Sequence, residues 1–262
     1  MVSQKKLILL SAITTLSVII ITGLYFYFKF PNSSPLYISG AVVPHHNLMA
    51  PQRADFFSEL SKHIIPPRTI VLLSPNHYSA GYGNIQTTSK DWELGEGQVN
   101  SDYDVVSFLV KNNFATDEPS SFIYEHGIYN ILTDIYNDFP NAKIVPIILK
   151  NVSQVELDKL EQGLKESCFD CLMIASVDFS HYMPTPVPQT HDEKSIKELQ
   201  TLNINAIFLD PDVDSGSALA LLVTWAKDHN TNYFNLQDHT DSGSNTKNLS
   251  VEATTHVFGW YQ

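Results

Sequence analysis

Short apolar segments of this chain end abruptly in polar residues, and three of them are followed closely by a histidine. Residues 37–46 read YISGAVVPHH, residues 69–77 read TIVLLSPNH and residues 171–182 read CLMIASVDFSHY. A short apolar run bounded by polar residues is typical of a strand buried on both faces of a parallel sheet. Apolar residues at helical spacing, such as Phe56 and Leu60, lie between these runs. The alternation predicts a three-layer α/β/α domain with a central, largely parallel sheet.

The same alternation continues toward the C-terminus. Glu125 begins a helical pattern, where an acidic side chain suits the helix N-terminus. Ser153 and Glu156 have the spacing of a capping box that opens the next helix, and residues 190–229 have helical spacing as well. The remaining strands of the sheet are expected at 143–149, 233–237 and 250–261.

The N-terminal region differs from the rest of the chain. Residues 7–28 contain no charged residue and are long enough to cross a bilayer as a helix, which needs about 20 residues. Lys5 and Lys6 precede this run, and Tyr25 and Tyr27 fit a membrane interface. A cleaved signal peptide usually has a shorter apolar core and leaves through small residues. We therefore expect one uncleaved transmembrane helix.

This expectation sets the predicted organisation of the chain. It comprises a cytoplasmic N-terminus at 1–6, a membrane anchor at 7–28, a linker at 29–36 and an α/β domain at 37–262. The basic residues before the anchor place the domain outside the cytoplasm in a single-pass membrane protein, with the membrane as a partner. The formal net charge of −12 argues against nucleic acid or an anionic membrane surface as the main partner.

The chain has only two cysteines, Cys168 and Cys171, in the sequence CFDC. In the cytosol such a pair suggests redox or metal chemistry, and outside the cytoplasm it suggests a small disulfide loop. One pair is too few for a structural zinc site of four cysteines.

The histidines that follow the apolar runs suggest a metal site. Ligands bind just outside the carboxyl ends of the strands in an open parallel sheet. If the three runs are neighbouring strands, His45 or His46, His77 and His181 converge at that edge together with Asp178. Converging neutral imidazoles favour a transition metal. The competing interpretation is that Asp178 caps the next segment and His181 is an ordinary surface residue.

Several sequence blocks resemble the signature blocks of the Memo family, whose bacterial and archaeal members are called AmmeMemoRadiSam system protein B. The resemblance spans roughly residues 38–262 and implies a fold similar to that of the class III extradiol dioxygenases. Those enzymes hold a non-haem iron with two histidines and a third ligand. The blocks are PHH at 44–46, LLSPNHY at 72–78, EHGI at 125–128, SVDFSHY at 176–182, GSALALL at 216–222 and TDSGSNTKNLSV at 240–251.

The resemblance implies roles for individual residues. His45 and His77 match the two metal-binding histidines of the family. Asp178 and His181 match the acidic residue and the histidine that face the metal, and His126 matches a pocket histidine. Asp178 would then orient or share a proton with the site, and His181 would act as the acid/base or as an additional ligand.

The third metal ligand is less defined, and two residues depart from the family pattern. The dioxygenases use a Glu and some Memo members a Cys in the last loop, whereas this chain has no Cys there and offers Asp241, Asp238 or His239. Asp241 is the first choice because a carboxylate completes a two-histidine, one-carboxylate face. His46 replaces a small residue of the family's PHAG, and Tyr129 replaces a Glu. Successive strand side chains face opposite ways, so only one of His45 and His46 should reach the metal, and the motif favours His45.

These features predict a metal-binding, Memo-like protein that acts as a non-haem iron-dependent, dioxygenase-like oxidoreductase on an unidentified substrate. Fe(II) is the expected cofactor, with copper or zinc as alternatives. A non-catalytic module that binds a small molecule or a peptide is the competing class, and a zinc hydrolase is a third interpretation. Resemblance of fold alone does not establish an activity.

Overall fold

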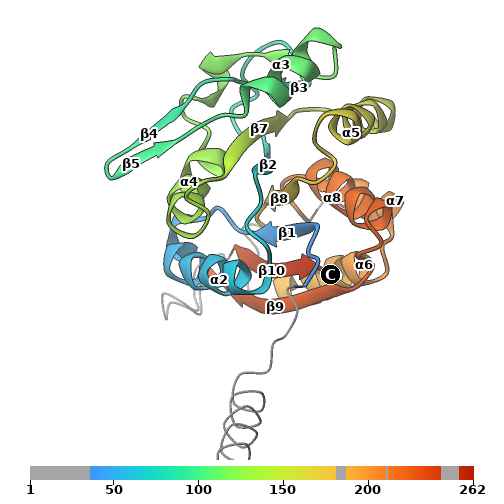
Figure 1. The fold of residues 1–262 in the computed structure, drawn as a ribbon. Coiled ribbons are helices and arrows are strands. Elements are labelled where there is room, and N and C mark those ends of the chain that lie inside the picture. Colours follow the sequence, from blue (N-terminus) through green and yellow to red (C-terminus); the bar gives the residue numbers. More distant parts are fainter. Residues whose placement is uncertain (1–35, 181–186, 211, 243–253) are drawn as a thin grey trace, which may run out of the picture. The chain divides into compact units, whose positions relative to one another are not determined.

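The computed structural model describes residues 36–180, 187–210, 212–242 and 254–262 (Figure 1). Within this part of the chain, Tyr37–Gln262 forms one compact unit. Its main feature is an eight-stranded sheet with the order β6-β3-β7-β2-β8-β1-β10-β9, and a separate two-stranded ribbon pairs β4 with β5. The strands are β1 Gly40–Val43, β2 Thr69–Pro75, β3 Ile85–Thr87, β4 Trp92–Leu94, β5 Gly97–Val99, β6 Thr116–Asp117, β7 Lys143–Leu149, β8 Leu172–Ser176, β9 Phe234–Asp241 and β10 Thr255–Tyr261.

The centre of the sheet is parallel, as the sequence predicted. Strands β7, β2, β8 and β1 run in one direction. At one edge β10 and β9 are antiparallel to their neighbours, and on the other side β3 is antiparallel to β7. The sheet is therefore mixed but largely parallel.

The central strands are buried on both faces. Val71 and Leu73 of β2 pack in one apolar cluster, whereas Ile70 and Leu72 pack in the other. The first cluster contains side chains of α3, α5 and α8, and the second contains side chains of α2 and α4. Helices thus cover both faces of the sheet (Figure 1), and the predicted α/β class is confirmed.

Most helices begin and end close to where the residue pattern placed them. The capping box of α5 is formed, because Ser153 Oγ accepts from the Glu156 amide and the Glu156 carboxylate accepts from the Ser153 amide. Cys168, the last residue of α5, is joined in a disulfide to Cys171, which directly precedes β8. The described α-helices are α2 Ala50–His63, α3 Tyr103–Lys111, α4 His126–Asp138, α5 Gln154–Cys168, α6 Val187–Gln200, α7 Ile204–Phe208 and α8 Gly216–Asp228.

The predicted membrane helix is corrected by the structure. Among the described residues, no helix is both long and apolar enough to cross a bilayer. The longest described helix, α5, has 15 residues and is about 22 Å long at 1.5 Å per residue, which is short of a hydrocarbon core about 30 Å thick. The expected span, residues 7–28, lies outside the described residues. The membrane anchor, the membrane as a partner and the single-pass membrane location derived from that span are therefore withdrawn.

The strand register brings three chain segments to one edge of the sheet. Val43 at the end of β1 pairs with Ser176 at the end of β8, and Leu73 near the end of β2 pairs with Ala175 of β8. These strands are parallel, so their carboxyl ends lie at the same level. The residues that follow β1, β2 and β8 must therefore lie close together.

Candidate metal centre

His45 and His77 meet at the carboxyl edge of the sheet. His45 follows β1 and is 1% exposed, and His77 follows β2. Their ring centroids are 4.8 Å apart with the ring planes at 90°. Two histidines from different strands are thus adjacent, as the sequence pattern predicted.

The Nδ1 atom of each ring has an oxygen partner in the protein. His77 Nδ1 lies 2.6 Å from Glu125 Oε1, and the buried Glu125 carboxylate also accepts from the His77 amide at 3.0 Å. His45 Nδ1 lies 3.3 Å from Ser176 Oγ, and that hydroxyl donates its own hydrogen to Gly127 O at 2.6 Å. Both Nδ1 atoms therefore act as donors. Neutral rings held in this way present the Nε2 lone pair to the site, which is the arrangement of metal-binding histidines.

A carboxylate faces both Nε2 atoms, and it belongs to Asp214. Asp214 Oδ2 lies 3.2 Å from His45 Nε2 and 3.7 Å from His77 Nε2. Paired hydrogen bonds hold Asp214 in place, because its amide donates to Asp178 O at 3.1 Å and Asp214 Oδ2 accepts from the Asp178 amide at 3.1 Å. No sequence motif singled out Asp214. The available signal was weak, namely an acidic residue just before the 216–222 block.

This donor set fits a metal ion. A carboxylate only accepts, and two neutral Nε2 atoms only accept, so either a metal ion or protons on the rings are needed between them. Ligands about 2 Å from one ion lie about 3 Å apart, which is close to the separations observed here. Asp214 Oδ1 is buried and has no hydrogen-bond partner among the described residues. Residues His45, His77 and Asp214 could therefore hold the ion.

The pKa values of His77, His45 and Asp214 also indicate that this site favours a positive charge. Burial lowers the pKa of His77, but hydrogen bonds with Asp214 and Glu125 outweigh it and raise that pKa to about 9. Burial likewise opposes protonation of His45, but the Asp178 and Asp214 carboxylates raise its pKa above the usual value. Burial raises the pKa of Asp214, but His45 and His77 outweigh it and lower that pKa to about 2. Without a metal, protons take its place.

His126 and Asp178 also lie at this centre. The ring centroid of His126 is 4.0 Å from that of His77 and 5.1 Å from that of His45. Burial, with His77 and His45 nearby, lowers the pKa of His126 to about 4. Asp178 Oδ2 is 3.4 Å from His45 Nε2, and Asp178 Oδ1 accepts from the His45 amide at 3.2 Å. His181 lies outside the described residues.

The sequence was compared with the profiles of known protein families. The sequence profile of the Memo family, described as "Memo-like protein", matches residues 24–255. This chain belongs to the Memo family.

Individual relatives agree with the Memo assignment. A MEMO1 family protein of Caldivirga maquilingensis is 27% identical over 219 residues, which cover 79% of this chain and 77% of the relative. A MEMO1 family protein of Saccharolobus solfataricus is 30% identical over 149 residues, or 54% of this chain and 52% of that relative. A crystal structure of an uncharacterized protein from Escherichia coli K12 covers 84% of this chain and all 100% of its own, with a TM-score of 0.56 and 11% identity. That structure supports the fold alone.

The other third-ligand candidates in this Memo chain are not part of the described groups that could hold a metal. Asp241 ends β9, which β10 separates from β1. In the described part of the chain, two metal-competent groups have ligand atoms within 4.8 Å of one another, namely His45, His77 and His126, and His45, Asp178 and Asp214, and Asp241 belongs to neither. Asp238 is exposed, and His239 Nε2 instead bonds Asp192 Oδ2 at 2.7 Å. Asp214 is thus the carboxylate that the structure places beside both histidines.

Of the two residues that depart from the Memo pattern, His46 has a local structural role and Tyr129 is exposed. His46 Nδ1 accepts from the Leu48 amide at 3.2 Å and caps the short 3-10 helix η1 Asn47–Met49. Its ring lies beside His256, with centroids 5.4 Å apart. Tyr129 is 54% exposed. Only His45 of the PHH sequence belongs to the metal-competent groups of the described residues.

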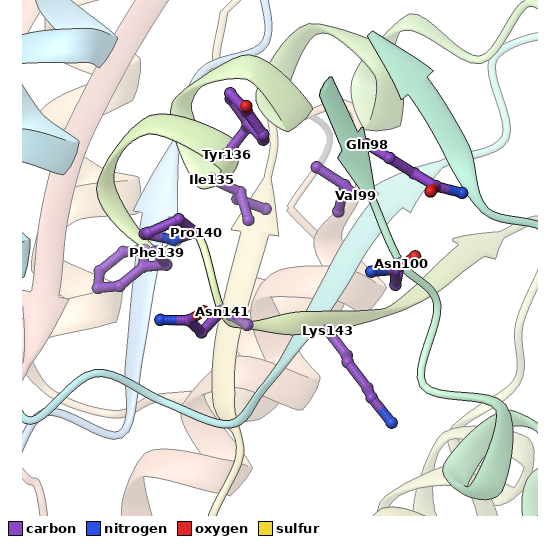
Figure 2. Close-up of a pocket in the computed structure, with 10 residues that line it drawn as sticks. Gln98, Val99, Asn100, Ile135, Tyr136, Phe139, Pro140, Asn141 and Lys143 are labelled. Atoms are coloured by element: carbon purple, nitrogen blue, oxygen red, sulfur yellow. The ribbon is translucent and has the colours of Figure 1, made fainter. Parts of the chain in front are cut away.

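A separate hollow of about 200 Å³ lies away from this centre (Figure 2). It is bounded by the C-terminal half of α4, by β5 and by Lys143 at the start of β7. Thr69 pairs with Lys143 at the first residues of β2 and β7, whereas His77 follows the last residue of β2. The hollow is therefore at the opposite end of the parallel strands from the metal centre.

Proposed function

We propose that this Memo protein is a non-haem iron-dependent, dioxygenase-like oxidoreductase whose metal is held by His45, His77 and Asp214. The observation that carries the proposal is that the Nε2 atoms of two histidines from parallel strands face one carboxylate oxygen. Two histidines and one carboxylate with open positions are the ligand set of non-haem Fe(II) oxygenases. Bound Fe(II) would supply redox chemistry with O₂ as the co-reactant.

The protein residues would bind, orient and move protons. Glu125 and Ser176 fix the orientation of the two histidine rings through their Nδ1 atoms. Asp178 holds the His45 amide and the Asp214 carboxylate. His126, with its lowered pKa, is a neutral imidazole at neutral pH and can accept a proton from a substrate hydroxyl.

Metal content and oxygen uptake test the proposed function together. The full-length protein, purified and reconstituted with Fe(II), should hold one ion per chain and consume O₂ with catechol-like compounds. The metal-free and zinc-loaded forms serve as controls and should consume none. Absence of stoichiometric metal would favour a non-catalytic binding module, and hydrolysis by the zinc form without oxygen uptake would favour a hydrolase.

Metal affinity should depend on pH because protons compete for the same lone pairs. The pKa of His77 is raised to about 9 in the metal-free state, so below that pH a metal ion must displace a proton. We expect the affinity to fall by about tenfold per pH unit for each displaced proton as the pH decreases from about 9 to about 6. Dissociation constants measured across that range check this prediction.

A remote histidine provides the control for the pH dependence. The pKa of His239 is also raised, mainly by its hydrogen bond to Asp192. His239 belongs to neither metal-competent group of the described residues. His239→Gln should leave the pH profile of metal binding unchanged. A dissociation constant that is constant between about pH 6 and about pH 9 in the wild type would contradict the proposed coordination by His77.

A further inference from the structure

Arg53 is a buried arginine on α2 whose guanidinium nitrogens are all used. It is 3% exposed. Arg53 Nε donates to Asp134 Oδ2 at 2.5 Å, and Nη2 donates to Asn130 O at 2.8 Å. Nη1 donates to Pro44 O at 3.3 Å and to His46 O at 3.5 Å. One side chain thus joins α4 to the loop that carries His45.

The carbonyl between those two acceptors is also held from α4. Asn130 Nδ2 donates to His45 O at 2.8 Å. Three consecutive carbonyl oxygens therefore accept hydrogen bonds from these side chains. Arg53 donates to those of Pro44 and His46, and Asn130 donates to that of His45. These bonds leave the backbone at His45 little freedom to move relative to α4.

The N-terminus of α4 supplies the other side of the metal centre. His126 is the first residue of α4, and Glu125, which binds His77, is its N-cap. Helices α2 and α4 lie side by side over the same face of the sheet (Figure 1). A connection between α4 and the His45 loop therefore sets the position of His45 relative to His77.

We propose that Arg53, together with Asn130 and Asp134, is a positioning residue of the metal centre. The inference rests on the metal site proposed above. Arginine suits this role because its planar fork donates in several fixed directions at once, which the single ammonium of lysine cannot reproduce. The guanidinium does not touch the metal ligands' side chains; it acts through the backbone on both sides of His45.

The test compares metal affinity with stability in matched variants of the full-length protein. Arg53→Lys keeps the charge and loses the fork. The double variant Arg53→Met/Asp134→Leu removes both buried charges, which avoids an unpaired carboxylate. We expect both to bind Fe(II) or Zn²⁺ about 10–100-fold more weakly, the usual effect of losing an outer support of a metal site. The double variant should keep a thermal midpoint close to that of the wild type.

Two further variants control the comparison. Asn130→Ala removes only the bond to His45 O, so it should weaken metal binding in the same direction with little change in the thermal midpoint. Arg68 is the only other arginine of the chain and is exposed, so Arg68→Met should bind metal like the wild type. If the double variant folds and binds metal with wild-type affinity, Arg53 serves only as the partner of Asp134 and the proposal is overturned. If the double variant does not fold, unchanged affinity in both Arg53→Lys and Asn130→Ala overturns it.

A metal-free measurement separates this proposal from the proposed function. The His45 amide donates to Asp178 Oδ1, so its hydrogen exchange reports on the position of this loop. Exchange should be faster in Arg53→Lys and Asn130→Ala than in the wild type and in Arg68→Met. If the wild type binds no metal, the proposed function fails, but faster exchange in the two variants still supports the positioning role of Arg53. Equal exchange in all four proteins overturns that role.

Discussion

Replacing His45 or His77 by alanine should leave the protein folded and without bound metal. Each histidine supplies one Nε2 ligand, and the carboxylate of Asp214 faces both of them. Loss of one imidazole leaves two protein ligands, which is too few for a stable site. Asp214→Ala should also release the metal or bind it far more weakly. Metal analysis of the purified variants, with circular dichroism to check the fold, measures the effect.

Two variants of neighbouring or competing candidates are the controls. His46 caps η1 and Asp241 ends β9, so His46→Ala and Asp241→Ala should keep most of the metal. Wild-type metal content in both His45→Ala and His77→Ala would place the site elsewhere. Loss of metal in Asp241→Ala but not in Asp214→Ala would assign the third ligand to β9 instead.

Replacing His126 by glutamine should reduce oxygen-dependent turnover by about 10²–10⁴-fold, the usual loss when a positioned acid/base is removed. His126 lies beside both His45 and His77, and its lowered pKa keeps it neutral. Glutamine keeps a polar side chain but cannot accept a proton at neutral pH. Turnover is measured as O₂ uptake by iron-loaded protein, with metal content determined in the same samples.

His181→Ala provides the comparison for that result, because the resemblance of the SVDFSHY block to the Memo family implies the same acid/base role for His181. The residue with the larger loss at full metal content is the principal acid/base. Full turnover in His126→Gln would show that His126 is not required for proton transfer. Loss of metal in that variant would make His126 a ligand and would contradict the assignment of Asp214 as the third one.

The approach of His45 and His77 to one another could be predicted from the sequence because it depends on local patterns. His45 and His77 follow apolar strands within a few residues, and parallel strands bring their carboxyl ends to one edge. His46, next in the chain, instead caps η1, and because β1 already ends at Val43 this results from the local cap and not from strand alternation. The local sequence pattern was therefore sufficient to predict that these two histidines lie together.

The remaining parts depend on long-range contacts that a single sequence does not contain. Asp214 reaches the centre from a segment before α8, far along the chain from His45, and its bonds to Asp178 become visible only once the fold is known. Glu125 has the sequence features of a helix cap, and it does accept from the Gly127 amide at 3.1 Å, but its main contact is His77. The position of Arg53 on α2 gave no sign that it is buried.

The most direct test of the central claim is an anomalous diffraction map of the iron-loaded crystal, recorded at the iron absorption edge. We predict one peak per chain between His45 Nε2, His77 Nε2 and the Asp214 carboxylate. The absence of an anomalous peak at these three side chains in a fully iron-loaded protein would contradict the account.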